Sequence, residues 1–415
     1  MSWYTSWSYL PVNYNATIGT IENITQRTFF RNNLNGTHVK VKFSNRYGRE
    51  PLILEKAVIG QKREGESEIA QTQVLTRRGE QRIVIGSGEE FFCDELPWKI
   101  QAGTEIVLSV YIRERTNVRS ACSTWRAESW HTVYGENGDF TETESFEEKQ
   151  SREVYPYVEA DVNKADIVVG VSAICVLSEA EVTTIALFGD SITHMSYFAD
   201  ALGGVLYRDY PGRVTLVNRG IGGNRILRDA SFVKDMPGEG ACFGAAGAAR
   251  FERDVYETEH PDYILMLEGV NDMMHPEFFG NLDESVTAAE LAAGVEEIVK
   301  TAHRHESRIY LGTVMPFGND EMPGCPRGEQ VRGEFNAWLR TQRLADGLFD
   351  FDGALQDAER PKYLKAGLHI GDGLHPNEAG GAAMAAVVLA EGRQTDADHT
   401  DGIPGREDKG IHRKL

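Results

Sequence analysis

The sequence predicts an all-β sandwich of jelly-roll-like type, followed by an α/β domain built on a parallel sheet. Up to about residue 178, strand signals recur between turn-rich segments, which is typical of an antiparallel sandwich. After that point short apolar strands alternate with helical patterns, which favours a parallel sheet covered by helices on both faces. We therefore divide the 415 residues into a β domain (1–178), an α/β domain (179–392) and a polar C-terminal tail (393–415).

The strand signal of the first domain is clearest where apolar and charged residues alternate. Val39, Val41 and Phe43 alternate with Lys40 and Lys42, which is the period of a half-buried strand. The acidic stretch at 136–166 reads as loop. Further strands are expected at 81–87, 105–114 and 167–178.

The second domain alternates between short apolar strands and segments with the period of a helix. Its clearest helical pattern covers 288–305, where one face carries Leu291, Val295, Ile298, Val299 and Ala302. Active sites of parallel sheets lie at the carboxyl ends of the strands. Strands are expected at 184–188, 214–218, 263–269, 308–314 and 348–352, and further helices at 329–345 and 377–392.

Composition and charge narrow the class of partner. A net charge of −20 argues against nucleic acid, whose phosphates need a basic face, and against an anionic membrane surface. No apolar run reaches membrane-spanning length. The five cysteines are scattered, odd in number and without a CxxC pair, so we expect reduced thiols and a cytoplasmic protein. The alternative is a secreted protein whose signal peptide has been removed.

Four short motifs follow predicted strands: FGDSIT (188–193), NRGIGG (218–223), GVND (269–272) and DGLHPN (372–377). Each has an ordinary structural reading, namely a helix cap, a tight glycine turn, a polar turn and an Asx-turn. Taken together, they supply a hydroxyl nucleophile, bare backbone N–H groups, a side-chain amide and a histidine three residues after a carboxylate. That set of groups indicates acyl transfer.

In this order, the four motifs resemble those of the SGNH hydrolases, also called the GDSL esterase/lipase superfamily, over about residues 180–392. The longer forms LVNRGIGGNR and LEGVND are similar to a subgroup of acyl-hydrolases that includes proteins from xylan-utilisation clusters. In that subgroup a β-rich segment precedes the hydrolase domain. The resemblance implies a three-layer α/β fold for the second domain.

The resemblance also assigns roles to individual residues. It implies that Ser191 is the nucleophile, His375 the general base and Asp372 the carboxylate that orients it. The oxyanion donors would be the backbone N–H of Ser191, the backbone N–H of Gly223 and the side chain of Asn271. No metal ion and no organic cofactor is expected.

The substrate is predicted from residues beside these motifs. Arg225, Met273 and His275 are candidates for lining the substrate site. The insertion at 229–251 holds few bulky apolar residues, which favours a short acyl group on a polar alcohol. In the β domain three aromatic residues are either candidates for stacking on sugars or core residues: Trp125, Trp130 and Tyr134.

We therefore expect a serine esterase that cleaves short-chain, acetyl esters by way of an acyl-enzyme. Its expected partner is a small-molecule or oligosaccharide ester, and we favour carbohydrate O-deacetylation of plant-polysaccharide oligosaccharides. Two alternatives remain open within the hydrolases: a general aryl- or acyl-esterase and a lysophospholipase-like enzyme. A third alternative is an inactive carbohydrate-binding protein. Neither nucleic acid nor membrane is expected as a partner, and a homo-oligomer is allowed.

Overall fold

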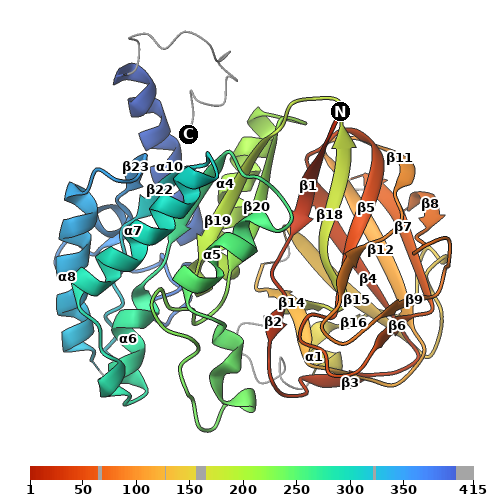
Figure 1. Cartoon of the computed structure of the whole chain (residues 1–415), viewed down its shortest axis with the longest axis horizontal. Helices are drawn as coiled ribbons and strands as arrows, with labels where there is room; N and C mark the ends of the chain where they lie inside the picture. The colour runs from red at the N-terminus through yellow and green to blue at the C-terminus, as the bar shows by residue number, and fades with distance from the viewer. Residues whose placement is uncertain (64–67, 127, 156–164, 321–323, 399–415) are drawn as a thin grey trace.

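The computed structural model describes residues 1–63, 68–126, 128–155, 165–320 and 324–398. The first part of the chain is rich in strands and the second part contains both strands and helices (Figure 1). Each part has its own hydrophobic cluster. Among the helices described, none is both long and apolar enough to cross a membrane.

The β-rich part contains two large antiparallel sheets. The five-stranded sheet runs β1 (Ser2–Ser8), β18 (Val171–Ser178), β5 (Gly36–Ser44) and β10 (Glu90–Phe92), with β11 (Leu96–Ile100) also paired to β5. The six-stranded sheet runs β16 (Lys149–Gln150), β15 (Trp130–Glu136), β4 (Ile24–Asn32), β12 (Thr104–Ile112), β7 (Lys56–Arg63) and β8 (Ala70–Val74). Residues from both sheets share one hydrophobic cluster.

Shorter strands and one helical turn complete this part. The apolar side of β5 is confirmed, because Val39, Val41 and Phe43 are fully buried. The polar side is covered in part, because Lys42 is also buried and pairs with Glu257 of the other part. The single strand expected at 167–178 is interrupted after Val168 and forms two strands in different sheets. The jelly-roll-like connectivity stays a prediction. The shorter elements are β2 (Val12–Asn13), β3 (Gly19–Ile21), β6 (Leu52–Leu54), β9 (Ile83–Ile85), β13 (Thr116–Val118), β14 (Ser120–Thr124), β17 (Asp166–Val168) and α1 (Ser151–Val154).

The second part is built on a five-stranded parallel sheet, which confirms the α/β prediction. Its order is β20 (Val214–Gly220), β19 (Thr183–Gly189), β21 (Tyr263–Leu267), β22 (Arg308–Gly312) and β23 (Gly347–Phe349). Every residue of β19 and β21 is buried, as expected for central strands covered on both faces.

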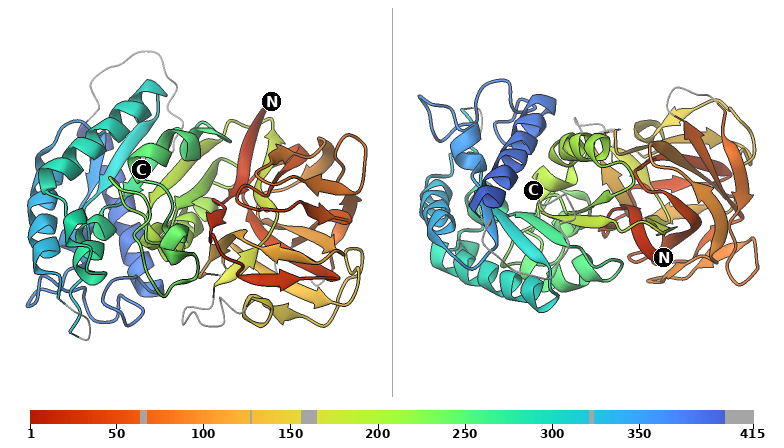
Figure 2. Two further views of the ribbon diagram at one scale, coloured as in Figure 1. Left: turned by 60° about the horizontal axis from the view of Figure 1, so that its bottom comes forward. Right: turned by 90° about the horizontal axis from the view of Figure 1, so that it is seen from above.

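Helices cover both faces of this sheet. Helices α4 (Tyr197–Asp209) and α10 (Glu378–Asp398) pack together on one face, and α5 (Gly247–Tyr256) and α7 (Ala288–Arg304) lie on the other (Figure 2). The remaining helical elements are α3 (Ser191–His194), α6 (Val270–Phe278), α8 (Pro326–Thr341), α9 (Phe351–Leu355), η1 (Pro237–Phe243) and η2 (Leu282–Glu284).

The helix predicted at 288–305 illustrates why these segments fold as they do. Thr287 caps α7 and forms a capping box with Glu290, and the expected apolar face is buried. Helix α10 continues to Asp398, past the boundary expected at residue 392, so its last residues belong to the segment predicted as tail. The rest of that tail, 399–415, lies outside the described residues.

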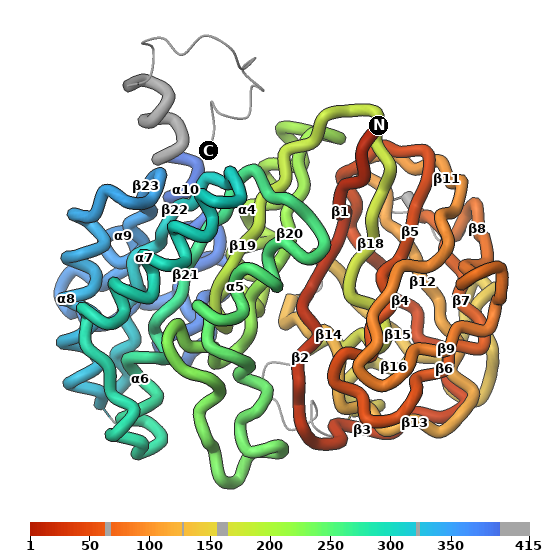
Figure 3. The backbone as a smooth tube through the Cα atoms, viewed as in Figure 1, coloured from red at the N-terminus to blue at the C-terminus, as the bar shows by residue number. Residues whose placement is uncertain are grey.

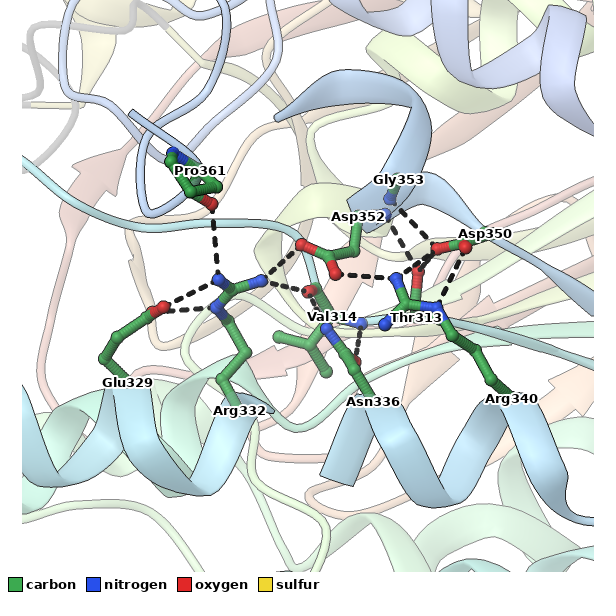
Figure 4. A network of polar contacts seen from close by, with 10 residues as sticks. All are labelled: Thr313, Val314, Glu329, Arg332, Asn336, Arg340, Asp350, Asp352, Gly353 and Pro361. Atoms are coloured by element: carbon green, nitrogen blue, oxygen red, sulfur yellow. Dashed lines mark hydrogen bonds and ion pairs between the residues drawn. The ribbon is translucent and has the colours of Figure 1, made fainter. Parts of the chain in front are cut away.

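Buried charges join helix α8 to the ends of two strands (Figure 4). Arg332 binds Glu329 on its own helix and Asp352 at the start of α9, and Asn336 bonds the backbone of Val314 with both amide atoms. Arg340 adds a second bridge to Asp352. This network anchors the chain that leaves β22, and the loop that follows reaches the candidate site.

The two parts meet along β1 and β20, which lie side by side in Figure 3. The hydroxyl of Thr215 donates to the carbonyl oxygen of Thr5 at 2.7 Å. Glu257 accepts from Arg46 at 2.7 Å. The β-rich part is therefore packed directly against the edge strand of the parallel sheet.

Candidate active site

Ser191 is the first residue of α3, directly after strand β19 ends. The side chain of Asp190 caps this helix by accepting the Ile192 N–H at 3.0 Å. A Cβ atom at Gly189 would collide with the carbonyl oxygen of Leu267, so only glycine fits at the end of the strand. The cap is therefore Asp190 and not Ser191, which leaves the serine hydroxyl available for other contacts.

That hydroxyl is bound by a histidine from the other end of the domain. The Nε2 atom of His375 lies 2.8 Å from Ser191 Oγ, and its Nδ1 atom lies 2.5 Å from an oxygen of Asp372. The other oxygen of Asp372 accepts the backbone N–H groups of Leu374 and His375, both at 3.0 Å. The structure thus brings these three predicted residues together in the order serine, histidine, carboxylate.

Two further side chains hold the turn that carries Asp372. The Nδ1 atom of His369 accepts the N–H groups of Gly371 and Gly373, both at 3.1 Å. The side-chain amide of Asn319, from the loop after β22, donates to the Asp372 carbonyl at 2.7 Å. His369 therefore stabilises the turn that carries Asp372.

The electrostatics favour a charged Asp372. Burial opposes its ionisation, but the hydrogen bonds from His375 and from two backbone N–H groups outweigh burial and hold the pKa of the carboxyl below its usual range. The side chains of His375 and Asp372 are 21% and 37% exposed, so solvent reaches this end of the site. A carboxylate in this position orients the imidazole of His375, so that its Nε2 atom faces Ser191.

The predicted oxyanion donors lie on the same edge of the sheet. The chain after β20 turns at 221–224, where Asn224 N–H donates to the Ile221 carbonyl at 3.1 Å and Gly223 has a φ of +74°. A Cβ atom on Gly222 would lie 4.0 Å from Ser191 Cβ, so this turn lies beside the serine. Asn271 donates one side-chain N–H to the Asn224 carbonyl at 2.9 Å. The turn and the amide are therefore joined to one another.

Buried charges beneath these loops were missed by the sequence analysis. Arg250 is fully buried and donates to the carbonyl oxygens of Gly189 and Arg219, both at 2.9 Å, and to Asn224 Oδ1 at 2.7 Å. Its neighbour Glu268 is also buried. Burial raises the pKa of Asp190 to about 7 and that of Glu268 well above its ordinary value. Arg250 thus ties together the strand ends that carry the serine and the glycine turn.

The residues predicted to line the substrate site are placed differently from the prediction. Arg225 is buried and bonds Glu284 and the Asp229 carbonyl. Met273 belongs to the hydrophobic cluster of the sheet. His275 is buried, with Nδ1 2.9 Å from Ser231 Oγ. All three side chains lie in the protein interior and not on the wall of a substrate site. Helix α6 directs them inward, or a neighbouring loop covers them.

The aromatic residues predicted in the β domain divide into two groups. Trp130 and Tyr134 are fully buried and belong to the core. Trp125 is half-buried, and its ring packs edge-on against His194 at 5.2 Å between centroids. Its neighbour Arg126 binds Glu378, three residues after His375. The segment 123–126 therefore reaches the candidate site from the other part of the chain.

Within the described residues, no group of three His, Cys, Asp or Glu side chains is arranged to hold a metal ion. Among the described residues, the side chains of Ser191, His375 and Asp372 hydrogen-bond to one another and to backbone N–H groups. The arrangement supports acyl transfer through a serine nucleophile.

Solved structures similar to this chain cover about half of it. An alpha/beta hydrolase from the metagenome of Lake Arreo is 26% identical and matches over 51% of this chain and 95% of its own length, with a TM-score of 0.37. A catalytic mutant of an acetylxylan esterase from Geobacillus stearothermophilus is 21% identical over 52% and 96%, with a TM-score of 0.39. A GDSL-like lipase from Bacteroides thetaiotaomicron is 16% identical over 50% and 87%, with a TM-score of 0.37.

No curated protein matches the chain. The model of the GDSL-like lipase/acylhydrolase family matches residues 187–383. This range contains all four motifs and every residue placed around Ser191 except those from the β-rich part. Residues 187–383 are therefore a hydrolase domain of the GDSL-like lipase/acylhydrolase family.

Proposed function

We propose that this chain is a serine esterase in which Ser191 is the nucleophile, His375 the general base and Asp372 the carboxylate that orients the histidine. One observation carries the proposal: the 2.8 Å contact between Ser191 Oγ and His375 Nε2, continued at 2.5 Å to Asp372. Hydroxyl, imidazole and carboxylate in this sequence of contacts form the arrangement that activates a serine.

The reaction proceeds through an acyl-enzyme. Ser191 attacks the ester carbonyl while His375 takes its proton, and Asp372 stabilises the imidazolium that results. The backbone N–H groups of Ser191 and Gly223 and the amide of Asn271 bind the oxyanion. When this intermediate collapses, the alcohol leaves with the proton from His375. Water, activated by the same histidine, then releases the acid.

We further propose that the substrate is a short-chain ester of a hydrophilic alcohol, with an O-acetylated oligosaccharide of plant origin as the favoured case. The exposed fractions of His375 and Asp372 support an ester that approaches directly from water. The rim at this point carries the ion pair between Arg126 and Glu378. A charged rim of this kind suits a hydroxylated alcohol better than a lipid chain. Trp125, which is half-buried and packs against His194, is our candidate for contact with a sugar ring.

The serine chemistry is tested by labelling the full chain with a fluorophosphonate probe. Wild-type protein should be labelled and should hydrolyse p-nitrophenyl acetate, and S191A should do neither while keeping its thermal unfolding temperature. A wild-type protein that is neither labelled nor active would overturn the proposal and favour the carbohydrate-binding alternative.

The substrate is tested separately. Acetylated xylo- and manno-oligosaccharides are incubated with wild type and S191A, and acetyl release is followed by mass spectrometry. Release by wild type alone supports the carbohydrate substrate. Strong hydrolysis of octanoyl or lysophospholipid esters without acetyl release would instead favour the general acyl-esterase or lysophospholipase-like alternative.

A further inference from the structure

His194 is a buried histidine three residues after the nucleophile, and the mechanism above gives it no task. Its Nδ1 atom accepts the Gly222 N–H at 3.0 Å. Its Nε2 atom lies 3.2 Å from Ser123 Oγ in the β-rich part of the chain. The imidazole therefore bridges the turn that carries Gly223 and a strand of the other domain.

The contact with Gly222 determines which ring nitrogen carries the proton. A backbone N–H is only a donor, so Nδ1 must present a lone pair. In the neutral ring the proton then lies on Nε2, which donates to Ser123 Oγ. Burial is the largest cause that lowers the pKa of His194 to about 4; the contact with Ser123 opposes this shift and the charge of Arg250 adds to it, both effects being included in that value. The ring is therefore neutral near pH 7, as acceptance at Nδ1 requires.

The Gly222 contact bears on the direction of the Gly223 N–H. Gly222 and Gly223 are the central residues of the turn closed between Asn224 N–H and the Ile221 carbonyl. The φ of +74° at Gly223 is the value of a type II turn. Types I and II differ by a flip of the peptide between the two central residues, and this peptide carries the Gly223 N–H. A restraint on Gly222 therefore helps to decide where the Gly223 N–H points.

The β-rich part holds the histidine from the opposite side. Ser123 is buried and lies on β14, which is paired with β17 and β2. Trp125, just after this strand, packs edge-on against the imidazole. A second contact runs in parallel, because Tyr9 and Thr124 bind the hydroxyl of Ser196 at 2.6 and 3.1 Å. Helix α3 is thus held at its C-terminal end by the neighbouring domain.

We propose that His194 is a positioning residue that holds the Gly222–Gly223 turn in its oxyanion-binding form, and that Ser123 of the β domain holds the ring from its Nε2 side in the orientation that makes this contact. The inference rests on the proposed esterase function. It makes the β domain a part of the catalytic apparatus.

Three substitutions of His194 and one of Ser123 separate the two contacts of the ring. In H194N the amide oxygen stands close to the position of Nδ1 and can accept the Gly222 N–H, but the contact with Ser123 is lost. In H194Q the amide reaches the position of Nε2 and keeps the contact with Ser123, but no acceptor faces Gly222. H194L has a side chain of about the volume of histidine and can make neither contact. S123A removes the support from the β domain alone.

The measurements are kcat and KM for p-nitrophenyl acetate with the full chain, alongside thermal unfolding. We expect kcat to fall by about 10- to 100-fold in H194Q and H194L, because a misplaced donor costs up to about 10²-fold. In H194N kcat should stay within about fivefold of wild type. The kcat of S123A should lie between those of H194N and H194Q. KM should change by less than about threefold throughout, because the oxyanion forms after the substrate binds.

The comparison of kcat between H194N and H194Q tests the proposal, because both variants are polar amides that should disturb the packing to a similar extent. If H194N loses as much kcat as H194Q, the Gly222 contact does not position the turn and the proposal is overturned. A loss of unfolding temperature without the difference in kcat would show a packing role only. A wild-type enzyme without Ser191-dependent hydrolysis would contradict the proposed function instead, before any His194 variant is measured.

Discussion

His375 and Ser191 are 184 positions apart in the sequence and are joined by a contact of 2.8 Å between Nε2 and Oγ. The contact depends on two separate backbone structures. One is the strand–helix junction capped by Asp190, and the other is the turn held by His369 and Asn319. Any change that moves either structure should reduce the rate even where the three reacting side chains remain.

Replacing Asp372 by Asn tests the carboxylate. The Asn oxygen can keep the bonds to the backbone N–H groups of Leu374 and His375, but the negative charge opposite Nδ1 is lost. We expect kcat to fall by roughly 10²- to 10⁴-fold on p-nitrophenyl acetate, because the imidazolium is no longer stabilised. The control is D357N, since Asp357 accepts the backbone N–H groups of another turn in the same way and within the described residues has no contact with His375. Equal kcat in D372N and D357N would contradict the role of Asp372.

Replacing Asn271 tests the oxyanion site. One N–H of its amide binds Asn224, which leaves the second for the substrate. N271A removes this donor, and N271D removes it and adds negative charge, so we expect kcat to fall by about 10²- to 10³-fold in N271A and further in N271D. As a control, N32D changes a buried amide of the β-rich part, bound to the carbonyl oxygens of Leu34 and Gln101, and should lower the unfolding temperature with kcat nearly unchanged.

Two arginines on helix α5 offer a matched comparison of stability. Arg250 is buried and donates to three groups beneath the site, whereas the side chain of Arg253 is 48% exposed, and both contact Asp254. We expect R250K to lower the free energy of unfolding by about 3 kcal/mol, because it leaves buried acceptors unsatisfied. R253K should change it by less than about 1 kcal/mol. Chemical denaturation measures both, and similar losses would rule out a special role for Arg250.

His275 gives a pH dependence of stability with a definite sign. Burial, with a contribution from Arg225, lowers its pKa from 6.5 to about 3. Below pH 6.5 the unfolded chain therefore gains a proton that the folded chain does not, and stability is lost as the pH falls from 6.5 toward 3. H275N lacks this loss. The unfolding temperature of H275N should be below that of wild type at pH 8, and the gap should narrow at pH 4.5. A gap that is constant with pH would refute this.

Local patterns made much of the fold accessible from the sequence. All five strands of the parallel sheet overlap the predicted ranges, because each contains a short apolar run. The last prediction, 348–352, was too long: β23 ends at Phe349, and Asp350 caps helix α9. The buried face of α7 was found because its period is helical. The four motifs were found because each is a contiguous segment in which backbone geometry and chemistry coincide.

The errors and omissions have a common physical cause, which is that sequence adjacency does not give direction. Met273 follows Asn271 by two residues in α6, so the helix turns it by about 200° away from the amide. His275 lies about one helical turn after Asn271, and Ser231 covers it. Arg250 is of a type usually found at the surface, and its burial depends on acceptors from three distant segments. The approach of Ser123 to His194 depends on how two domains pack.

The pairing of β1 with β18 has a consequence for synthesis. Ser2 lies opposite Ser178, so β1 leaves the ribosome long before its partner β18, which lies at the far end of the β-rich part. Its hydrogen bonds cannot form until about 170 further residues have emerged, and its contact at Thr5 must wait for Thr215. Contacts so distant in sequence slow folding and leave a strand edge exposed meanwhile. We expect the nascent chain to need protection of this edge during translation.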